Sequence, residues 1–248
     1  MKLILFDVDG TLVDSQNVIA ASIRRAFQAY GMEPPSRERS LSIVGLSLVE
    51  AFTVLAGPKA PVEGLAQAYK EAYTVLHPDP ANEAPLFPGA GECIARLQGR
   101  DDVRLGLATG KSRKGVARLI AQQGWEGVFS TIQTADDAPS KPHPAMILQA
   151  VEELGVAPED AMMIGDSSYD MAMARAAGVL PVGVAWGFQP VAALKEAGAD
   201  RIVDSYDELE PVLQGFLAHR ADPKGRAGEE WTRFSAQNDA LLDNGASD

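Results

Sequence analysis

Cysteine is almost absent from this sequence: Cys93 is the only one among 248 residues, so no intrachain disulfide can form. This scarcity is typical of proteins in a reducing compartment. Cys93 lies in the largely apolar run 93–97, where a small buried side chain is a simpler interpretation than a nucleophile. The three histidines, His77, His143 and His219, are too far apart in the sequence to predict a zinc site.

Basic residues are also scarce, with 22 Lys and Arg against 34 Asp and Glu, which gives a net charge of −12. A chain with this balance repels phosphate backbones at long range, and no run of Lys or Arg offsets the repulsion, so nucleic-acid binding is not expected. A small anionic substrate remains compatible with the composition, because a metal ion and one or two cations can reverse the field locally.

Long apolar runs are missing as well. Residues 1–6 are mostly apolar, but Asp7 and Asp9 follow at once, whereas a signal peptide needs a longer apolar stretch and a small-residue cleavage site. No segment approaches the length needed to span a bilayer. We therefore expect a soluble, cytoplasmic protein with no membrane partner.

What the sequence does contain is a regular alternation of short apolar runs with helical patterns, and an apolar content of 46% that is sufficient for a buried core. Buried strands are predicted at residues 2–6, 103–108, 161–164 and 179–184, with weaker ones near 128–133 and 201–203. Helices are predicted at 112–123, 142–154, 168–177 and 190–196. Strands that alternate with helices indicate an α/β fold, a doubly wound parallel sheet with helices on both faces.

Residues 15–87 break this alternation. Their helical patterns, near 18–30, 46–56 and 64–76, are separated by Pro and Gly pairs, and no convincing strand lies among them. We predict an all-helical domain inserted after the first strand, with a return hinge near 85–91.

The remaining segments define the other expected domains. A core would consist of residues 1–14 and 88–218. Residues 219–248 are polar and rich in Gly, Asp and Glu, which favours a loose C-terminal tail. The alternative is a short amphipathic helix around Trp231 and Phe234.

Carboxylates occur at the ends of two predicted strands. The first strand runs directly into Asp7 and Asp9, and the run 161–164 is followed by Asp166 and Asp170. Any one of these residues could be a helix cap. Ligands of doubly wound sheets, however, bind beyond the carboxyl ends of the strands, and carboxylates gathered there repel one another unless a cation neutralises them. Hard oxygen ligands around an open site predict Mg²⁺.

Three further groups lie near such strand ends. Thr109 could cap the helix expected from residue 112, or its hydroxyl could donate to a phosphoryl oxygen together with the Gly110 amide. Lys141 precedes Pro142, which in the first turn of a helix would hold the lysine at the helix mouth. The alternative for Lys141 is an ordinary surface position.

The tripeptide Gly110-Lys111-Ser112 ends like a phosphate-binding P-loop. Leu105 occupies the position where that motif requires glycine, so the signature fails. We therefore interpret Lys111 as a solvent-facing or helix-start residue.

These residues together carry a resemblance to a known family. Residues 7–15, Asp-Val-Asp-Gly-Thr-Leu-Val-Asp-Ser, closely resemble the first signature of the haloacid dehalogenase (HAD) superfamily. Thr109, Lys141 and the pair Asp166 and Asp170 look like its second, third and fourth motifs, in the right order. The helical insertion resembles the small cap domain of that family, and the wording of the first signature is similar to that of the phosphoglycolate phosphatase-like branch.

The resemblance implies a role for each acidic residue. Asp7 would be the nucleophile that attacks phosphorus, and Asp9 would be the general acid and base. Mg²⁺ would be held by the Asp7 carboxylate, the Asp9 backbone carbonyl and Asp166. Asp170 would hydrogen-bond these ligands or Lys141.

The remaining residues would serve the substrate. By the same resemblance, Thr109, the Gly110 amide and Lys141 would bind the transferring phosphoryl oxygens. The segment 42–47 resembles the cap loop that reaches into the site, so Gly45 and Ser47 are hypothesised to touch the leaving group. Arg24 and Arg25 are interpreted as helix-surface charges, although they too could reach the substrate.

The function expected from this resemblance is a Mg²⁺-dependent phosphatase. Its substrate would be a small phosphate monoester, phosphoglycolate-like, hydrolysed through an aspartyl-phosphate. The alternative on the same scaffold is a phosphosugar mutase similar to β-phosphoglucomutase, and a third possibility is a non-catalytic adaptor that retains an enzyme fold. The only partner expected is a small phosphorylated metabolite, bound by a monomer or a homodimer.

Overall fold

A computed structural model describes residues 1–79, 81 and 83–218. The chain divides into two compact units, Met1–Tyr206 and Asp207–Asp248. In the second unit the described residues belong to helix α10 (Tyr206–Ala218), which sequence analysis did not predict. The tail predicted at 219–248 lies outside the described residues.

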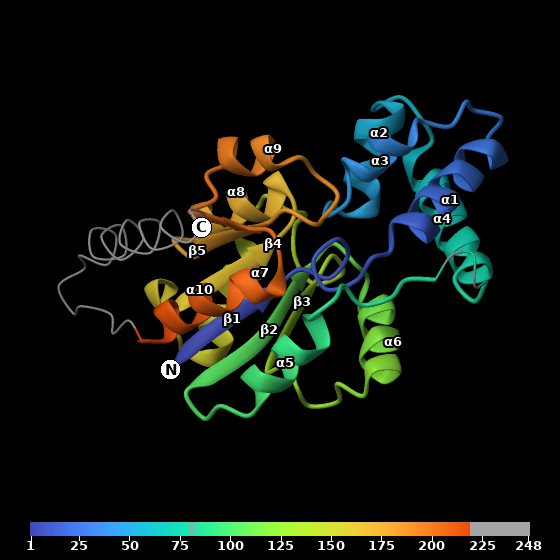
Figure 1. Cartoon of the computed structure of the whole chain (residues 1–248). Coiled ribbons are helices and arrows are strands. Elements are labelled where there is room, and N and C mark those ends of the chain that lie inside the picture. Colours follow the sequence, from blue (N-terminus) through green and yellow to red (C-terminus); the bar gives the residue numbers. More distant parts are fainter. Residues whose placement is uncertain (80, 82, 219–248) are drawn as a thin grey trace, which may run out of the picture. The chain divides into compact units, whose positions relative to one another are not determined.

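The first unit contains a six-stranded parallel sheet (Figure 1). Its strands are β1 (Lys2–Phe6), β2 (Val103–Thr109), β3 (Thr131–Thr134), β4 (Ala161–Gly165), β5 (Leu180–Val184) and β6 (Arg201–Val203). They lie in the order β3-β2-β1-β4-β5-β6, so the winding direction reverses between β1 and β4. This order is that of a doubly wound sheet, which confirms the predicted α/β fold class.

The two central strands are buried along their whole length. All five residues of β1 and all five of β4 are buried, and Leu5 pairs with Gly106 on one side and Met163 on the other. A nearly continuous apolar run is what a parallel strand covered on both faces requires. The charged exception, Lys2, forms an ion pair with Asp160 at 2.7 Å.

Helices α5 to α9 accompany the sheet. They span Ala90–Gln98 (α5), Arg113–Gln123 (α6), Ala145–Leu154 (α7), Ser168–Ala176 (α8) and Val191–Glu196 (α9), and a 3₁₀ turn covers Pro158–Asp160. Helix α7 packs on β2 and β3, α8 on β4 and β5, and α9 on β5 and β6. The apolar faces of α7 and α8 form one buried hydrophobic cluster with residues of β1, β2 and β4.

The start of one predicted helix in this part of the chain was wrong. The helix expected from residue 142 begins only at Ala145, with Pro144 as its N-cap. The last two residues of the hinge predicted at 85–91 belong to α5, for which Gly89 is the N-cap with a φ of 86°, and the hinge itself remains a prediction. Cys93 is buried on α5, as the simpler interpretation predicted.

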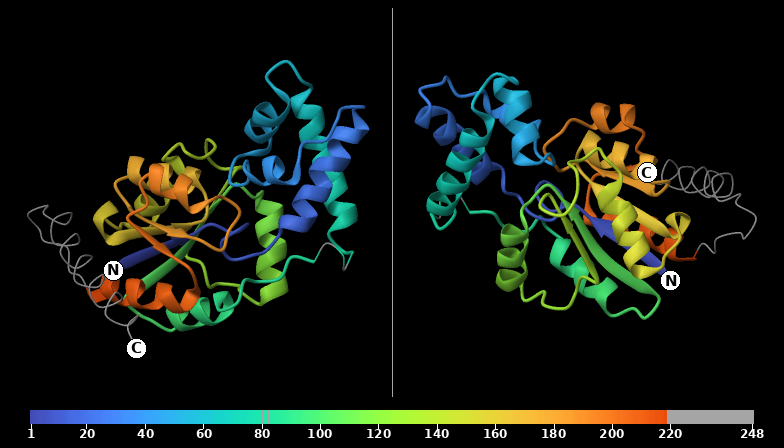
Figure 2. Two further views of the ribbon diagram at one scale, coloured as in Figure 1. Left: turned by 45° about the horizontal axis from the view of Figure 1, so that its top comes forward. Right: turned by 180° about the vertical axis from the view of Figure 1, so that it is seen from behind.

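Residues 15–87 form helices α1 (Gln16–Ala29), α2 (Arg37–Leu41), α3 (Leu48–Ala56) and α4 (Val62–Leu76), and no strand lies among the described residues of this region. The four helices gather into one bundle, in blue and cyan in Figure 2. Helix α4 packs against α1 and α3 around an apolar cluster that includes Ile23, Phe27, Phe52 and Leu65. The sequence missed α2, whose five residues are too short for a periodic signal.

The chain leaves the sheet after β1 to form this bundle, and it returns to the sheet beside the segment by which it left. The Phe87 amide donates to the Leu12 carbonyl at 2.9 Å, and the Asp14 amide donates to the Pro85 carbonyl at 2.8 Å. Val13 and Leu86 form an antiparallel bridge between these two bonds. The outgoing and returning segments therefore run side by side as a pair of linkers.

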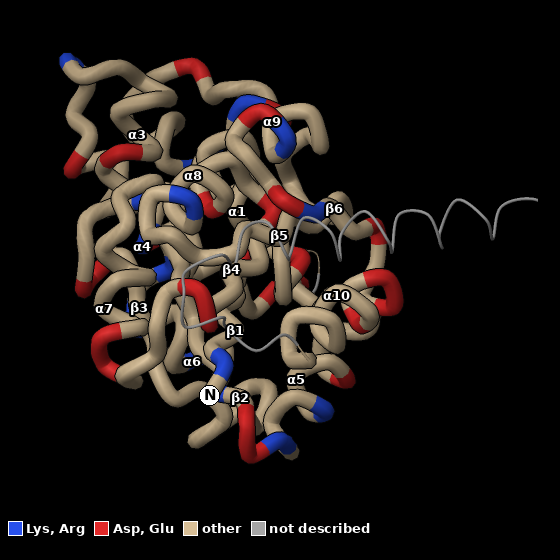
Figure 3. The backbone as a smooth tube through the Cα atoms, turned by 90° about the vertical axis from the view of Figure 1, so that its left-hand side faces the viewer, with Lys and Arg blue, Asp and Glu red and all other residues tan. Residues whose placement is uncertain are grey.

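Charged residues are dispersed along the described backbone. Basic and acidic positions are interspersed over helices and loops in the view of Figure 3. Among the described residues, no helix combines the length and the hydropathy required to cross a bilayer.

Candidate active site

Asp7 and Asp166 lie where the strand order of the sheet reverses. Each follows the end of a central strand, β1 or β4, and the Asp7 amide still donates to the Ile164 carbonyl at 2.9 Å. Both side chains are buried. One carboxylate oxygen from each of Asp7, Asp166 and Asp170 lies within 4.8 Å of the other two. The sequence-predicted carboxylates thus converge at the position where doubly wound sheets bind ligands.

Lys141 is the cation beside these carboxylates. Its side chain is fully buried, and its Nζ lies 3.0 Å from Asp7 Oδ2 and forms a second ion pair with Asp170 Oδ1. The other oxygen of Asp170 accepts from the Ser167 hydroxyl at 2.6 Å and from the Ser167 amide at 3.1 Å, which completes a capping box at the start of α8. Asp170 therefore caps a helix and also fixes the ammonium group of Lys141.

The charge balance of this cluster favours a further cation. Burial, with the nearby Asp170, raises the pKa of Asp7 to about 6 even though Lys141 and the Thr109 hydroxyl act in the opposite direction. Burial and the charges of Asp170 and Asp7 raise the pKa of Asp166 well above its ordinary value. Three buried carboxylates thus face one buried lysine, and a divalent ion bound by oxygen ligands would relieve the remaining repulsion.

Glycine backbone holds the Asp166 carboxylate in place. A Cβ atom on Gly10, whose φ is 90°, or on Gly187 would overlap the Asp166 side chain. Asp166 Oδ1 accepts from the Thr11 hydroxyl at 3.2 Å, and its Oδ2 accepts from the Phe188 amide at 2.8 Å. The glycine of the Asp-x-Asp-Gly sequence is therefore needed for the close approach of two strand ends as well as for the turn.

Asp9 has a separate set of partners. Its Oδ1 accepts from the Ser15 hydroxyl at 2.7 Å, and Lys111 Nζ lies 2.7 and 2.9 Å from its two carboxylate oxygens. Asp7 is thus paired with Lys141, whereas Asp9 is paired with Lys111. Two carboxylates that leave the same strand two residues apart have different electrostatic surroundings, which suits them to different chemical roles.

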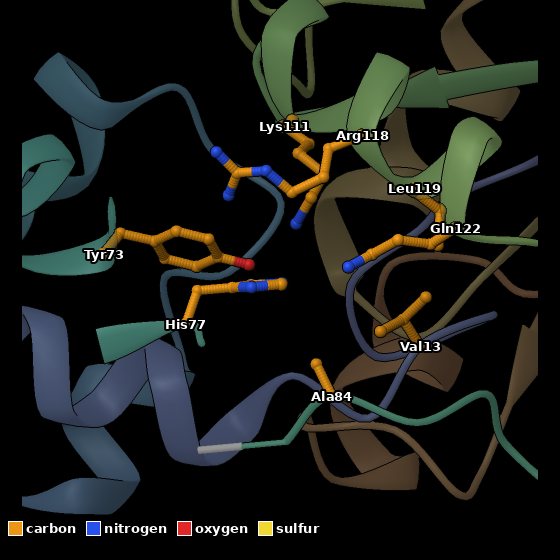
Figure 4. A pocket seen from close by; sticks show the side chains of 9 residues that line it. Val13, Tyr73, His77, Ala84, Lys111, Arg118, Leu119 and Gln122 are labelled. Carbon is orange, nitrogen blue, oxygen red and sulfur yellow. The ribbon is translucent and has the colours of Figure 1, made fainter. Parts of the chain in front are cut away.

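Lys111 directly precedes Ser112, the N-cap of α6, but the interpretation of its side chain as solvent-facing was wrong. Only 14% of its side chain is exposed, and its ammonium lies 5.5 Å from the ring centroid of Tyr73 on α4. Figure 4 shows Lys111 with Tyr73 and His77 around a small pocket. The sequence contains a signal for this position, because Lys111 comes two residues after Thr109, just beyond the end of the same strand.

Thr109 and Gly110 lie at the mouth of the site. Thr109 is buried, and its hydroxyl accepts from the Lys111 amide at 3.2 Å, while the Ser112 hydroxyl is the group that caps α6. The alternative of Thr109 as the helix cap is therefore wrong. A Cβ atom on Gly110 would lie 2.5 Å from the Gly45 carbonyl oxygen, so the segment 42–47 lies directly over this glycine.

The segment 42–47 is hydrogen-bonded to the loops that follow β3 and β5. The Ser47 amide donates to Ser140 Oγ at 2.9 Å, and Gln189 Nε2 donates to the Ser42 carbonyl at 3.0 Å. Gly45 and Ser47 line the same cavity as Asp7, and their contact with a leaving group remains a prediction. Arg24 and Arg25 are exposed on α1 and do not line this cavity, in agreement with their interpretation as surface charges.

That cavity has a volume of about 510 Å³. Asp7, Asp9, Thr109 and Lys111 line it at the end of the sheet, and helices α1, α3 and α4 line the opposite side. The sheet end therefore offers two carboxylates, a hydroxyl and the ammonium group of Lys111 around one space, and Lys141 pairs with Asp7 beside it. Such a set can bind and transfer an anionic group.

Comparisons with known proteins agree with this geometry. Residues 4–184 match the family model described as "Haloacid dehalogenase-like hydrolase". A probable phosphatase, IndB, from Dickeya dadantii is 31% identical over 224 residues, which cover 89% of this chain and 97% of that protein. A phosphoglycolate phosphatase from Nitrosococcus oceani is 30% identical over 217 residues, covering 86% and 96%.

A similar solved structure is that of a putative haloacid dehalogenase-like hydrolase from Bacteroides fragilis. It superposes with a TM-score of 0.77 at 27% identity, over 84% of this chain and 99% of that one. The similarity therefore includes the helical bundle as well as the sheet.

Proposed function

The chain belongs to the haloacid dehalogenase-like hydrolases and is a phosphatase of their phosphoglycolate phosphatase-like branch, and from this premise we propose its reaction. It hydrolyses a small phosphate monoester in a Mg²⁺-dependent manner, through a covalent acyl phosphate on Asp7. The observation that carries the proposal is the buried cluster of Asp7, Asp166 and Asp170 around Lys141, at the point where the sheet reverses.

Asp7 is the proposed nucleophile. It is buried, it lines the cavity, and its Oδ1 accepts from the Val8 amide at 2.7 Å, which fixes the carboxylate plane. Attack by an Asp7 oxygen on phosphorus forms a new P–O bond while the bond to the leaving alcohol breaks.

The residues present fit a divalent ion. Asp7 and Asp166 would hold Mg²⁺ through their carboxylates and Asp9 through its backbone carbonyl, while Asp170 would orient Lys141 beside them. Bound there, the ion supplies positive charge that screens the repulsion between an anionic nucleophile and an anionic phosphoryl group.

Asp9 is the proposed general acid and base. It would give a proton to the departing alkoxide and later take one from the water that cleaves the acyl phosphate. The contacts with Ser15 and Lys111 support this role because they fix the Asp9 carboxylate beside the cavity, apart from the Asp7 cluster.

Thr109, the Gly110 amide and Lys141 are the proposed ligands of the transferring phosphoryl oxygens. Thr109 and Gly110 line the cavity beside Asp7, and the Lys141 ammonium lies 3.0 Å from the Asp7 carboxylate. An ammonium held so close to the nucleophile would lie beside the phosphoryl group during transfer, where its charge stabilises the transition state.

We further propose that the chain is organised as a catalytic core, residues 1–14 and 88–218, and a helical cap, residues 15–87. The paired linkers and the placement of segment 42–47 over Gly110 support a cap that covers the phosphoryl site. A cover of this kind excludes bulk water, which would otherwise weaken the electrostatic interactions inside.

Phosphate release from a panel of small phosphate esters tests the proposal. We expect inorganic phosphate to form with at least one ester in the presence of Mg²⁺, and the activity to disappear with EDTA and return when Mg²⁺ is restored. Phosphate release that is insensitive to EDTA would contradict the metal requirement. A sugar phosphate that is isomerised without net phosphate release would instead identify the mutase.

Replacement of Lys111 tests its contact with Asp9. We expect Lys111→Met to lower kcat by about 10- to 100-fold with a smaller change in KM, because a carboxylate displaced by about 1 Å transfers protons poorly. Lys111→Arg retains a cation and should recover part of the loss. Equal kcat values for the wild type and Lys111→Met would show that this ion pair has no part in positioning Asp9.

A further inference from the structure

The cavity beside Asp7 continues into the apolar interior of the helical cap. At that end it is lined by Ile19 and Ile23 of α1, Phe52 and Leu55 of α3, and Ala66 of α4. These five residues are at most 6% exposed and belong to the hydrophobic cluster of the cap. We call the part of the cavity that they line the cap chamber.

Protein interiors are normally close-packed, and apolar side chains collapse around a void because each lost contact costs free energy. Apolar cavities also do not hold water well, since water finds no hydrogen-bond partners there. An open space that connects the catalytic carboxylates with the cap chamber therefore favours an apolar group as its occupant.

The size of the cavity favours a bulky occupant. A cavity of about 150 Å³ accommodates a benzene molecule, and the whole cavity here measures about 510 Å³. A two-carbon leaving group attached to a phosphoryl group at Asp7 would leave most of this volume unfilled. A leaving group larger than a single ring would fill more of the cavity.

The walls of the cavity differ in polarity. All the residues that α1 and α3 contribute to the lining within the described chain are apolar. Polar lining residues come from α4, from α6 and from the sheet end: they include Lys70 and Thr74 on α4 and Lys114 and Arg118 on α6. A polyhydroxylated leaving group would find no side-chain hydrogen-bond partner on the α1 and α3 wall, whereas an alkyl or aryl group needs none.

Aromatic rings connect the cap chamber with the catalytic end. The ring centroids of Phe52 and Tyr69 lie 6.0 Å apart and those of Tyr69 and Tyr73 lie 5.9 Å apart, and the Tyr73 ring faces Lys111. All three rings line the cavity. An apolar chain or ring extending from the phosphate would contact this row of rings along its length.

Resting on the phosphatase function proposed above, we propose that the substrate is a phosphate monoester of a bulky apolar alcohol, alkyl or aryl. Its phosphoryl group lies at Asp7 and its apolar group occupies the cap chamber. The specificity-determining residues are then the apolar residues of α1 and α3 together with Ala66.

A series of n-alkyl phosphates from ethyl to octyl tests this proposal in the wild-type enzyme. Leaving-group acidity hardly changes along the series, so any trend in kcat/KM reports burial of the chain. We expect kcat/KM to rise by about 4-fold per methylene until the chamber is filled. A flat or falling trend, with ethyl phosphate still hydrolysed, would overturn the chamber while leaving the phosphatase function intact.

Binding of the corresponding n-alkylphosphonates, which cannot be hydrolysed, separates the two proposals. We expect calorimetry to show affinity that increases with chain length and a heat-capacity change that becomes more negative. Increasing affinity together with no turnover of any ester would support the cap chamber and refute the phosphatase function. Affinity that is independent of chain length would refute the cap chamber whether or not esters are hydrolysed.

A matched pair of variants locates the alkyl group. Ala66→Leu adds three carbons inside the cap chamber, and we expect it to shorten the chain length at which kcat/KM is greatest. Ala68→Leu makes the same change two residues along α4, at a position that does not line the cavity. This variant should keep the wild-type dependence of kcat/KM on alkyl chain length. If kcat/KM depended on chain length in the same way in both variants, the alkyl group would not lie in the cap chamber.

Discussion

Asp7→Asn is expected to lower phosphate release by about 10⁴- to 10⁶-fold, the loss typical of removing a covalent nucleophile. The amide is nearly the same size as the carboxylate, so the buried site should keep its packing. The substitution removes the anionic oxygen that we propose attacks phosphorus, and it weakens the repulsion with Asp166 and Asp170. Steady-state phosphate release with the best ester of the panel measures the effect.

The control for this variant is Asp101→Asn, the same chemical change at an exposed position before β2. It should keep wild-type activity. Both proteins should unfold cooperatively, and Mg²⁺ should still raise the melting temperature of Asp7→Asn because Asp166 remains. Robust turnover by Asp7→Asn would refute the covalent mechanism. Acid-quenched wild-type enzyme should carry the phosphoryl group on the peptide that contains Asp7.

Lys141→Met is expected to affect stability as well as activity. The side chain of Lys141 is fully buried between Asp7 and Asp170, and its loss leaves buried carboxylates without their cation. Removal of one partner from a buried ion pair typically costs about 3–5 kcal/mol. Activity should fall by at least about 10²-fold, because a positive charge beside the phosphoryl group is lost.

Chemical denaturation with and without Mg²⁺ measures the stability effect. We expect the free-energy difference between the wild type and Lys141→Met to be smaller with Mg²⁺, since the ion supplies charge to the same carboxylates. Lys195→Met, the same change at an exposed position on α9, should leave both stability and activity near the wild type. Unchanged unfolding of Lys141→Met would mean that the ion pairs contribute little to the folded state.

The sheet could be predicted from the sequence because its central strands are short apolar runs that end in a polar residue. Both β1 and β4 are buried on two faces, so their sequences leave little ambiguity. Helix α5 was missed because Ala90, Cys93, Ile94 and Leu97, its buried residues, follow a Pro-Gly pair that also signals a turn.

The convergence of Asp7, Asp166 and Lys141 was predictable because strand ends of a parallel sheet meet at one edge. The partners of Asp9 were not. Lys111 and Ser15 approach it through loop geometry that no periodicity encodes, and Tyr73 comes from a helix of the inserted region. The cap chamber could not be predicted from the sequence either, because apolar residues that line a cavity have the same sequence pattern as apolar residues that pack in a core.

The paired linkers have a consequence for how such enzymes diversify. Two backbone hydrogen bonds, between Leu12 and Phe87 and between Asp14 and Pro85, close the base of the inserted region. A segment that begins and ends at one closed base can be lengthened, shortened or exchanged during evolution without moving the strand ends that hold Asp7 and Asp166. New leaving groups can therefore be acquired by changing one contiguous stretch of the gene while the phosphoryl-transfer apparatus is inherited unaltered.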